Sequence, residues 1–131
     1  MLDTALALQT FFSSFGIPAF VQGKVPEFLY NAETQKEEAV DLPYITYELR
    51  EPAPGQNCHL MAHVWYRGNS VDAISRKVDD IKNGIGSGVS IPVPGGAVYL
   101  WPEDIFCQFR DSGEPEIQCA YLQFVMGGYK P

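Results

Sequence analysis

Residues 58–86 read CHLMAHVWYRGNSVDAISRKVDDIKNGIG, and the hydrophobic period of this stretch changes halfway along it. Residues 58–68 alternate with a period of two, which is typical of a β-strand buried on one side. Residues 69–86 carry apolar side chains three and four positions apart, which is typical of an amphipathic helix. One face of the strand holds Leu60, Ala62, Val64 and Tyr66, the other holds His59, Met61, His63 and Trp65, and the helix stripe holds Val71, Ile74, Val78 and Ile81.

The termini of this helix carry local signals. Asn69 or Ser70 is expected to cap its N-terminus, and Asp79 and Asp80 are expected to lie on its solvated side. The glycine-rich segment GIGSG (84–88) follows the helix, whereas phosphate-binding loops precede one and use its free N–H groups. The sequence therefore predicts that Gly84 ends the helix in a left-handed conformation and that the segment is not a phosphate site.

Elements on both sides of this stretch complete the fold. Residues 3–15 predict a helix with Leu8, Phe11, Phe12 and Phe15 on its apolar face, capped by Asp3 or Thr4. Short strands are expected in 19–23 and 27–31, and an alternating strand in 42–52. Residues 32–41 are polar and predict a surface loop, or an arm that becomes ordered only against a partner.

The C-terminal part predicts two β-hairpins, at 89–102 and 104–129. The first turns at Pro94, Gly95 and Gly96, and the second returns through 117–126, which is apolar on both faces like a central strand. The order of elements predicts one α+β domain over 1–131, an antiparallel β-sheet with two helices packed on one face, plus β-hairpins.

Composition limits the classes of ligand. The chain of 131 residues has 9 Lys and Arg against 16 Asp and Glu, a net charge of −7, and its basic residues are scattered. Such a chain is repelled by phosphate backbones, so specific nucleic-acid binding is not expected. Asp3 stands where a signal peptide carries basic residues, and no apolar run approaches the roughly 20 residues of a membrane span, so we expect a cytoplasmic site of synthesis and no membrane.

No motif assembles an active site, and we expect neither an enzyme nor a cofactor. Ser87 lies between glycines but lacks the preceding strand of a nucleophile elbow. Cys58, Cys107 and Cys119 form no CxxC pair and are expected to be structural thiols. His59 and His63 share a strand face, which leaves metal or small-molecule binding as an alternative, although no third ligand is evident in the sequence.

The order of elements resembles the tail terminator proteins of long-tailed bacteriophages, also called tail completion proteins and often filed as minor tail or minor capsid proteins. In that family a helix precedes a strand that begins with proline, and a long strand leads directly into a helix. Pro43-Tyr44-Ile45 matches the first pattern, and Val64-Trp65-Tyr66 through Ser70-Val71 matches the second. A hairpin and a final apolar strand complete the resemblance, which covers nearly the whole chain.

The resemblance implies a virion protein, assembled in the host bacterial cytoplasm, that forms a hexameric ring at the head-tail junction. Its partners would be further copies of itself, the tail tube protein and a head-side connector or stopper protein, with DNA passing through an electronegative lumen. A head-tail joining (neck) protein is the alternative within the same virion. Candidate interface residues are Met61, Trp65, Tyr99 and Trp101, the loop acids Glu33, Glu37 and Glu38, and the turn residues Pro94, Gly95 and Gly96.

Overall fold

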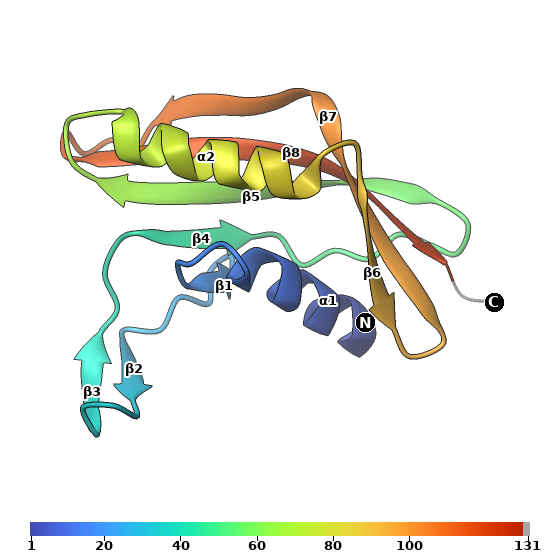
Figure 1. The fold of residues 1–131 in the computed structure, drawn as a ribbon, viewed down its shortest axis with the longest axis horizontal. Helices are drawn as coiled ribbons and strands as arrows, with labels where there is room; N and C mark the ends of the chain where they lie inside the picture. The colour runs from blue at the N-terminus through green and yellow to red at the C-terminus, as the bar shows by residue number, and fades with distance from the viewer. Residues whose placement is uncertain (130–131) are drawn as a thin grey trace.

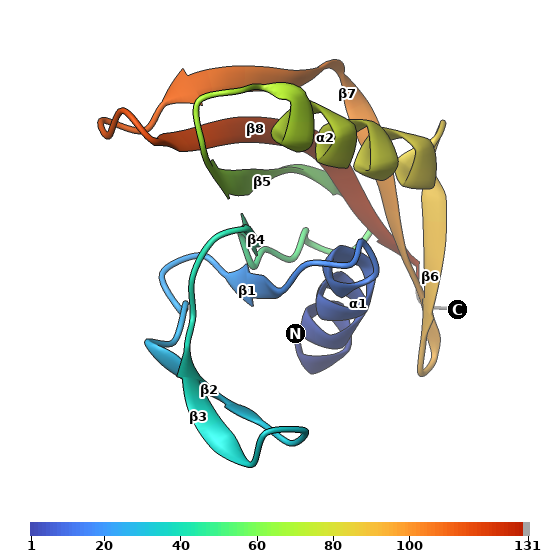
Figure 2. The ribbon, with the colours of Figure 1, turned by 60° about the vertical axis from the view of Figure 1, so that its left-hand side comes forward.

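A curled six-stranded sheet forms the body of the molecule, and a two-stranded sheet projects from it (Figures 1 and 2). The structure, a computed structural model, describes residues 1–129. The strand order of the large sheet is β1-β4-β5-β8-β7-β6, and its neighbours are antiparallel except for the parallel pair β1 and β4. The elements are α1 (Leu2–Ser13), β1 (Ala19–Val21), β2 (Phe28–Asn31), β3 (Lys36–Ala39), β4 (Tyr44–Tyr47), β5 (Asn57–Arg67), α2 (Asp72–Ile85), β6 (Val89–Val93), β7 (Gly96–Asp111) and β8 (Ile117–Tyr129).

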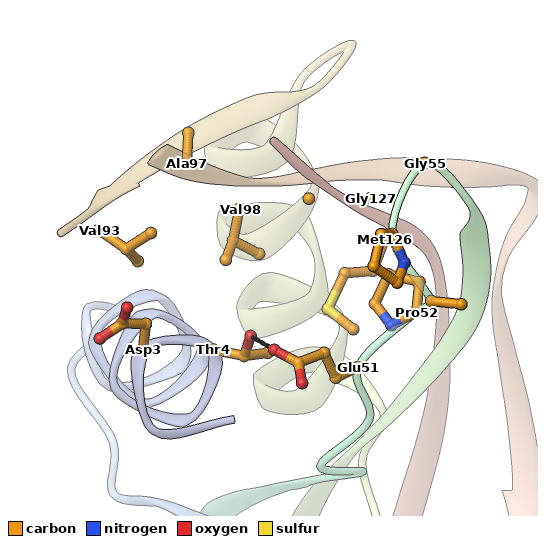
Figure 3. A pocket seen from close by; sticks show the side chains of 13 residues that line it. Asp3, Thr4, Glu51, Pro52, Gly55, Val93, Ala97, Val98, Met126 and Gly127 are labelled. Atoms are coloured by element: carbon orange, nitrogen blue, oxygen red, sulfur yellow. Dashed lines mark hydrogen bonds between the residues drawn. The ribbon is translucent and has the colours of Figure 1, made fainter. Parts of the chain in front are cut away.

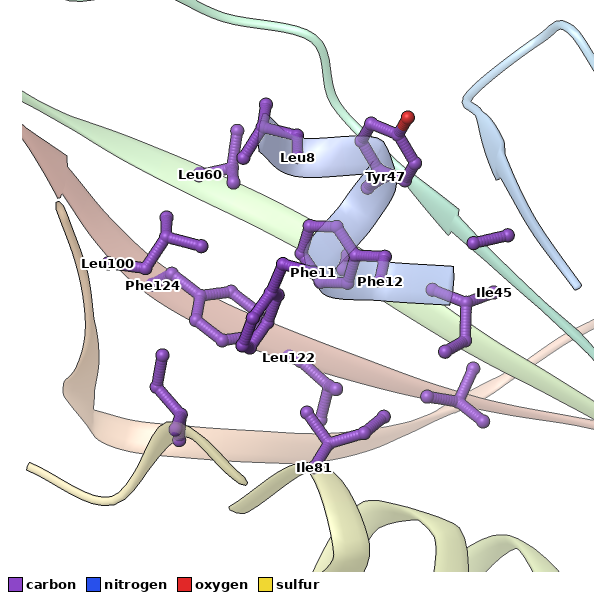
Figure 4. Close-up of a cluster of buried hydrophobic side chains, with 14 of the residues drawn as sticks. Leu8, Phe11, Phe12, Ile45, Tyr47, Leu60, Ile81, Leu100, Leu122 and Phe124 are labelled. Atoms are coloured by element: carbon purple, nitrogen blue, oxygen red, sulfur yellow. The ribbon is translucent and has the colours of Figure 1, made fainter. Parts of the chain in front are cut away.

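Both helices pack on the same face of the large sheet, which we call the inner face. Leu60, Ala62 and Val64 of β5 are fully buried there, as the alternation in the sequence predicts. Phe12 of α1 and Ile81 of α2 are buried in the same cluster (Figure 4). Each such side chain contributes about 1.5–3 kcal/mol by leaving water. The predicted fold class is confirmed, because the sheet is mostly antiparallel and carries both helices on one face.

The strand β8 lies in the middle of the sheet, between β5 and β7. It pairs with β5 along the whole length of that strand, from Asn57 opposite Gly127 to Arg67 opposite Ile117. The predicted central position of residues 117–126 is therefore confirmed. The two predicted hairpins share one long strand, β7, because the chain continues past Pro102 with an irregular register between Pro102 and Cys107 instead of ending there.

The helix α1 is held by aromatic contacts. Phe12 stacks on Tyr47 with ring centroids 4.8 Å apart, and its edge meets Phe124. The predicted caps are wrong, because the helix begins at Leu2 with Met1 as its N-cap residue and no side-chain cap bond. The Thr4 hydroxyl instead donates to Glu51 Oε1 at 2.8 Å. Local sequence patterns could not predict this bond, because Glu51 is distant along the chain.

The helix α2 continues to Ile85 and does not end at Gly84 as predicted. Gly84 lies inside the helix, and Gly86, with φ 52°, is the C-cap residue. Gly84 serves packing instead: a Cβ there would lie 2.7 Å from Cε1 of Phe15. Val71 is the N-cap residue and is 57% exposed, so its predicted place on the buried stripe is wrong. The predicted cap Ser70 lies one residue before the N-cap, but its Oγ accepts a bond from the Asp72 N–H at 3.2 Å.

The predicted surface loop 32–41 contains a strand. Lys36–Ala39 forms β3, which pairs with β2 across a turn in which Gln35 has φ 57°. Both strands are almost wholly exposed, so neither face has the apolar alternation by which a strand is recognised. We call residues 28–39, the hairpin of β2 and β3, the arm. Figure 2 shows it extending away from the sheet and both helices.

Candidate interaction surfaces

The large sheet has an outer face that points away from both helices. The register shows which side chains share it, because directly opposite residues in an antiparallel pair point to the same side. Met61 lies opposite Gln123 and Trp65 opposite Cys119, while Trp101 lies opposite Val125 and Tyr99 opposite Gly127. The outer face therefore includes Thr46 of β4, His59, Met61, His63 and Trp65 of β5, Cys119, Tyr121, Gln123 and Val125 of β8, and Tyr99, Trp101, Gln108 and Arg110 of β7.

The four aromatic and methionine candidates thus lie on one face, but at two ends of it. The residues opposite Trp65 and Trp101, Cys119 and Val125, are six positions apart on β8. At about 3.3 Å per residue this separation is about 20 Å. All four are partly accessible, with Tyr99 at 37%.

At the Trp65 end, polar and aromatic side chains form a small cluster of their own. The indole N–H of Trp65 donates to Thr46 Oγ1 at 2.9 Å. The ring of His63 stacks near Trp65 and meets the edge of Tyr121, with centroids 4.1 Å apart. The guanidinium of Arg110 lies 4.5 Å from the centre of the Tyr121 ring, an attractive cation–π geometry.

His63 is the buried titratable group of this cluster. It is 7% exposed, and its Nδ1 has no hydrogen-bond partner. Burial lowers the pKa of His63, Glu48 opposes that shift, and Arg110 adds to it. The surroundings of His63 therefore favour the neutral form of its imidazole.

At the Trp101 end, side chains of β5 and β7 lie close to Gly127 of β8. A Cβ on Gly127 would lie 3.4 Å from the Trp101 ring and 2.7 Å from Asn57 Oδ1, so this position accommodates no side chain without movement. Close by, His59 Nδ1 lies 3.2 Å from Glu103 Oε1, and both side chains are 37% exposed. This partly solvated pair contributes little to stability.

The histidine pair considered for a metal is not brought together. His59 and His63 lie four residues apart on one strand, about 13 Å by strand geometry, with Met61 between them. His63 packs among rings and His59 pairs with Glu103. No group of three or more His, Cys, Asp or Glu in residues 1–129 is placed to hold a metal ion. The geometry gives no support to the metal alternative.

The arm places the predicted loop acids on a surface with exposed apolar side chains. Pairing puts Tyr30 opposite Glu37 and Leu29 opposite Glu38, on opposite sides of the hairpin. Phe28, Leu29 and Tyr30 are 51%, 44% and 65% exposed. Glu38 accepts hydrogen bonds from Asn31 Nδ2 and Thr34 Oγ1 at 3.2 and 3.1 Å, whereas Glu33 lies in the turn. The polarity of 32–41 indicated the acids, but the aromatic side chains were missed.

The other candidate turn lies far from the arm. Pro94 and Gly95 join β6 to β7, Gly95 has φ 78°, and Gly96 begins β7. Figure 1 shows this turn at the opposite end of the molecule from the arm. The structure therefore distributes the candidate residues over three regions: the outer face, the arm and the β6–β7 turn.

A pocket of about 340 Å³ lies beside the N-terminus of α1 (Figure 3). Its apolar side includes Val93, Val98 and Met126, and its polar edge includes Asp3 and the bonded pair of Thr4 and Glu51. Sequence reasoning missed it, because its lining comes from α1, the 51–55 loop and strands β6, β7 and β8. The residues that line it include no His, Cys, Lys or Arg, and the Thr4 hydroxyl is bonded to the Glu51 carboxylate.

The thiols of Cys58, Cys107 and Cys119 have low reactivity. Burial raises the pKa of Cys58 and Cys107, and raises the pKa of Cys119 to about 12. The thiolate is the reactive form of cysteine, so these three side chains remain protonated at neutral pH and act as small apolar groups.

The function has to be inferred from the surfaces described above, because no protein-family model and no curated protein matches this chain. Neither helix in the described part of the chain is long and apolar enough to cross a membrane.

Proposed function

We propose that this protein is a structural component of a bacteriophage virion, a tail terminator whose copies form a hexameric ring. The ring would cap the finished tail tube and join it to the head-side connector or stopper protein, and DNA would pass through its lumen. The observation that carries the proposal is that one chain presents two unlike surfaces, the apolar arm and the outer face. A ring requires such unlike surfaces, because each subunit contacts its two neighbours with different faces.

The element order adds support. An N-terminal helix, a strand after Pro43, a long strand that leads into a helix, a hairpin and a final central strand follow each other as in the tail terminator pattern. The net charge of −7 agrees with a lumen that does not retain DNA.

Solution mass over a concentration series tests the proposal. Multi-angle light scattering is expected to show a mass that rises toward six subunits, and negative-stain images of the protein mixed with tail tubes are expected to show a ring at one tube end. Binding to a connector but never to the tube would move the protein to the neck position of the virion. Failure to bind either partner, together with a monomeric mass, would overturn the proposal.

A further inference from the structure

The aromatic side of the arm is a surface without a cover in its own chain. Phe28 and Tyr30 point to the same side of the hairpin, since they are two positions apart on β2. They are 51% and 65% exposed, and Figures 1 and 2 show the arm extending away from the body. A two-stranded hairpin is marginally stable alone in water, so an arm that exposes large apolar groups indicates a surface for contact.

Charge on this side of the arm has one sign. Glu37 lies directly opposite Tyr30, so a carboxylate stands beside the aromatic rings. The arm holds three glutamates and one lysine, a net charge of −2. A surface that fits it presents apolar rings next to a cation.

The Trp65 end of the outer face has this composition. Trp65 and Tyr121 are partly accessible there, and Arg110 is exposed and lies over the Tyr121 ring at 4.5 Å. None of the ion pairs formed within residues 1–129 involves Arg110. The aromatic side of the arm and this end of the outer face therefore both present apolar rings, and the negative charge of Glu37 is complementary to the positive charge of Arg110.

We infer that the arm of one copy docks on the outer face of a second copy, with Tyr30 and Phe28 against Trp65 and Tyr121 and with Glu37 beside Arg110. This inference rests on the proposed function, because it requires that the copies associate. It adds which two surfaces meet.

The position of the arm explains why the second surface belongs to another copy. Asp41, just past the arm, accepts a bond from Arg67 at the end of β5 at 3.0 Å. The arm thus ends beside the sheet of its own chain, and Figure 2 shows it extending away from that sheet, so each copy can give an arm to one neighbour and accept an arm from the other. Standard interfaces use about 20–30 residues a side, more than the arm provides, so the contact predicts weak association that depends on concentration.

Charge exchange tests the inference directly. Sedimentation velocity over a concentration series is expected to show that Glu37→Arg and Arg110→Glu each weaken association about tenfold or more, since like charges then face each other. The double variant Glu37→Arg/Arg110→Glu is expected to recover most of the loss. Asp79→Arg is the matched control, because it makes the same reversal of charge at an exposed position of α2 that belongs to neither surface, and it is expected to leave association unchanged.

The outcomes separate this inference from the proposed function. Association of the wild-type chain that persists in both single variants, or a double variant no better than the singles, would overturn the arm contact and leave the ring proposal in place. A wild-type chain that stays monomeric at all concentrations would also overturn it, while ring formation on tail tubes would still support the proposed function. Circular dichroism of each variant shows whether a loss comes from unfolding.

Discussion

The two faces of the central strands differ in what covers them. On the inner face Leu60, Leu122 and Phe124 lie fully buried under both helices. On the outer face Trp65, Tyr121 and Met61 remain partly accessible, and the buried groups there are Cys119, Thr46 and His63. The inner face therefore stabilises the fold, and the outer face is available for contact. The arm extends this contrast, because it has no buried face.

The largest loss of stability is expected for a substitution on the inner face. Phe12→Ala removes a side chain that contacts Tyr47 and Phe124, and a residue with no exposed area is replaced by a cavity. The free energy of unfolding is expected to fall by about 3–5 kcal/mol. Urea denaturation followed by tryptophan fluorescence measures it. A loss below about 1 kcal/mol would show that the inner face is not the main stabilising layer.

A smaller effect is expected for the polar bond of the outer face. Trp65→Phe removes the N–H that donates to the buried Thr46 hydroxyl, and the expected loss is about 1–2 kcal/mol. Thr46→Val removes the acceptor. In a double-mutant cycle the two changes are expected to cost less together than the sum of the single losses. Additive losses would mean that the bond contributes nothing to stability.

The outer face also predicts a dependence on pH. Because burial lowers the pKa of folded His63, the unfolded state binds more protons below about pH 6.5. The contribution of His63 to stability is therefore complete above that pH and is lost as the pH falls toward the lowered pKa. The urea concentration at the midpoint of unfolding is expected to be lower at pH 5.5 than at pH 7.5. This decrease is expected to be smaller in His63→Leu. His59→Leu is the control, and an equal drop in wild type and His63→Leu would contradict the assignment.

The smallest effect on stability is expected in the arm. Phe28→Ser and Tyr30→Ser change exposed side chains, so the free energy of unfolding is expected to stay within about 0.5 kcal/mol. The same variants are expected to weaken self-association. A stability loss above 1 kcal/mol in monomeric protein would place these side chains against their own chain and remove the contrast between body and arm.

Much of the body follows from periodicity. The alternation around Leu60 and the stripe from Ile74 to Ile81 identify a strand and a helix and the buried side of each, because one-sided burial imposes a period of two on strands and 3.6 on helices. The arm lacks that signal. Its strands bury neither face, so their residues were free to be polar, and the segment resembled a loop.

The candidate surfaces were predicted in part. Met61, Trp65, Tyr99 and Trp101 were recognised as large side chains at alternating positions, but their common face depends on the register of β5, β8 and β7. Tyr121 and Arg110 were missed because each gains its role from a neighbour in another strand.

The sequence by itself determined the α+β class, the helix-forming and strand-forming segments, and the side of β5 that is buried, since these depend on local propensity and on the spacing of apolar residues. Only the tertiary structure decided that Gly84 packs under Phe15, that Thr4 bonds Glu51, and that the arm stands clear of the outer face. These features join residues that are distant along the chain. No local pattern records such contacts, because packing of the whole chain selects them.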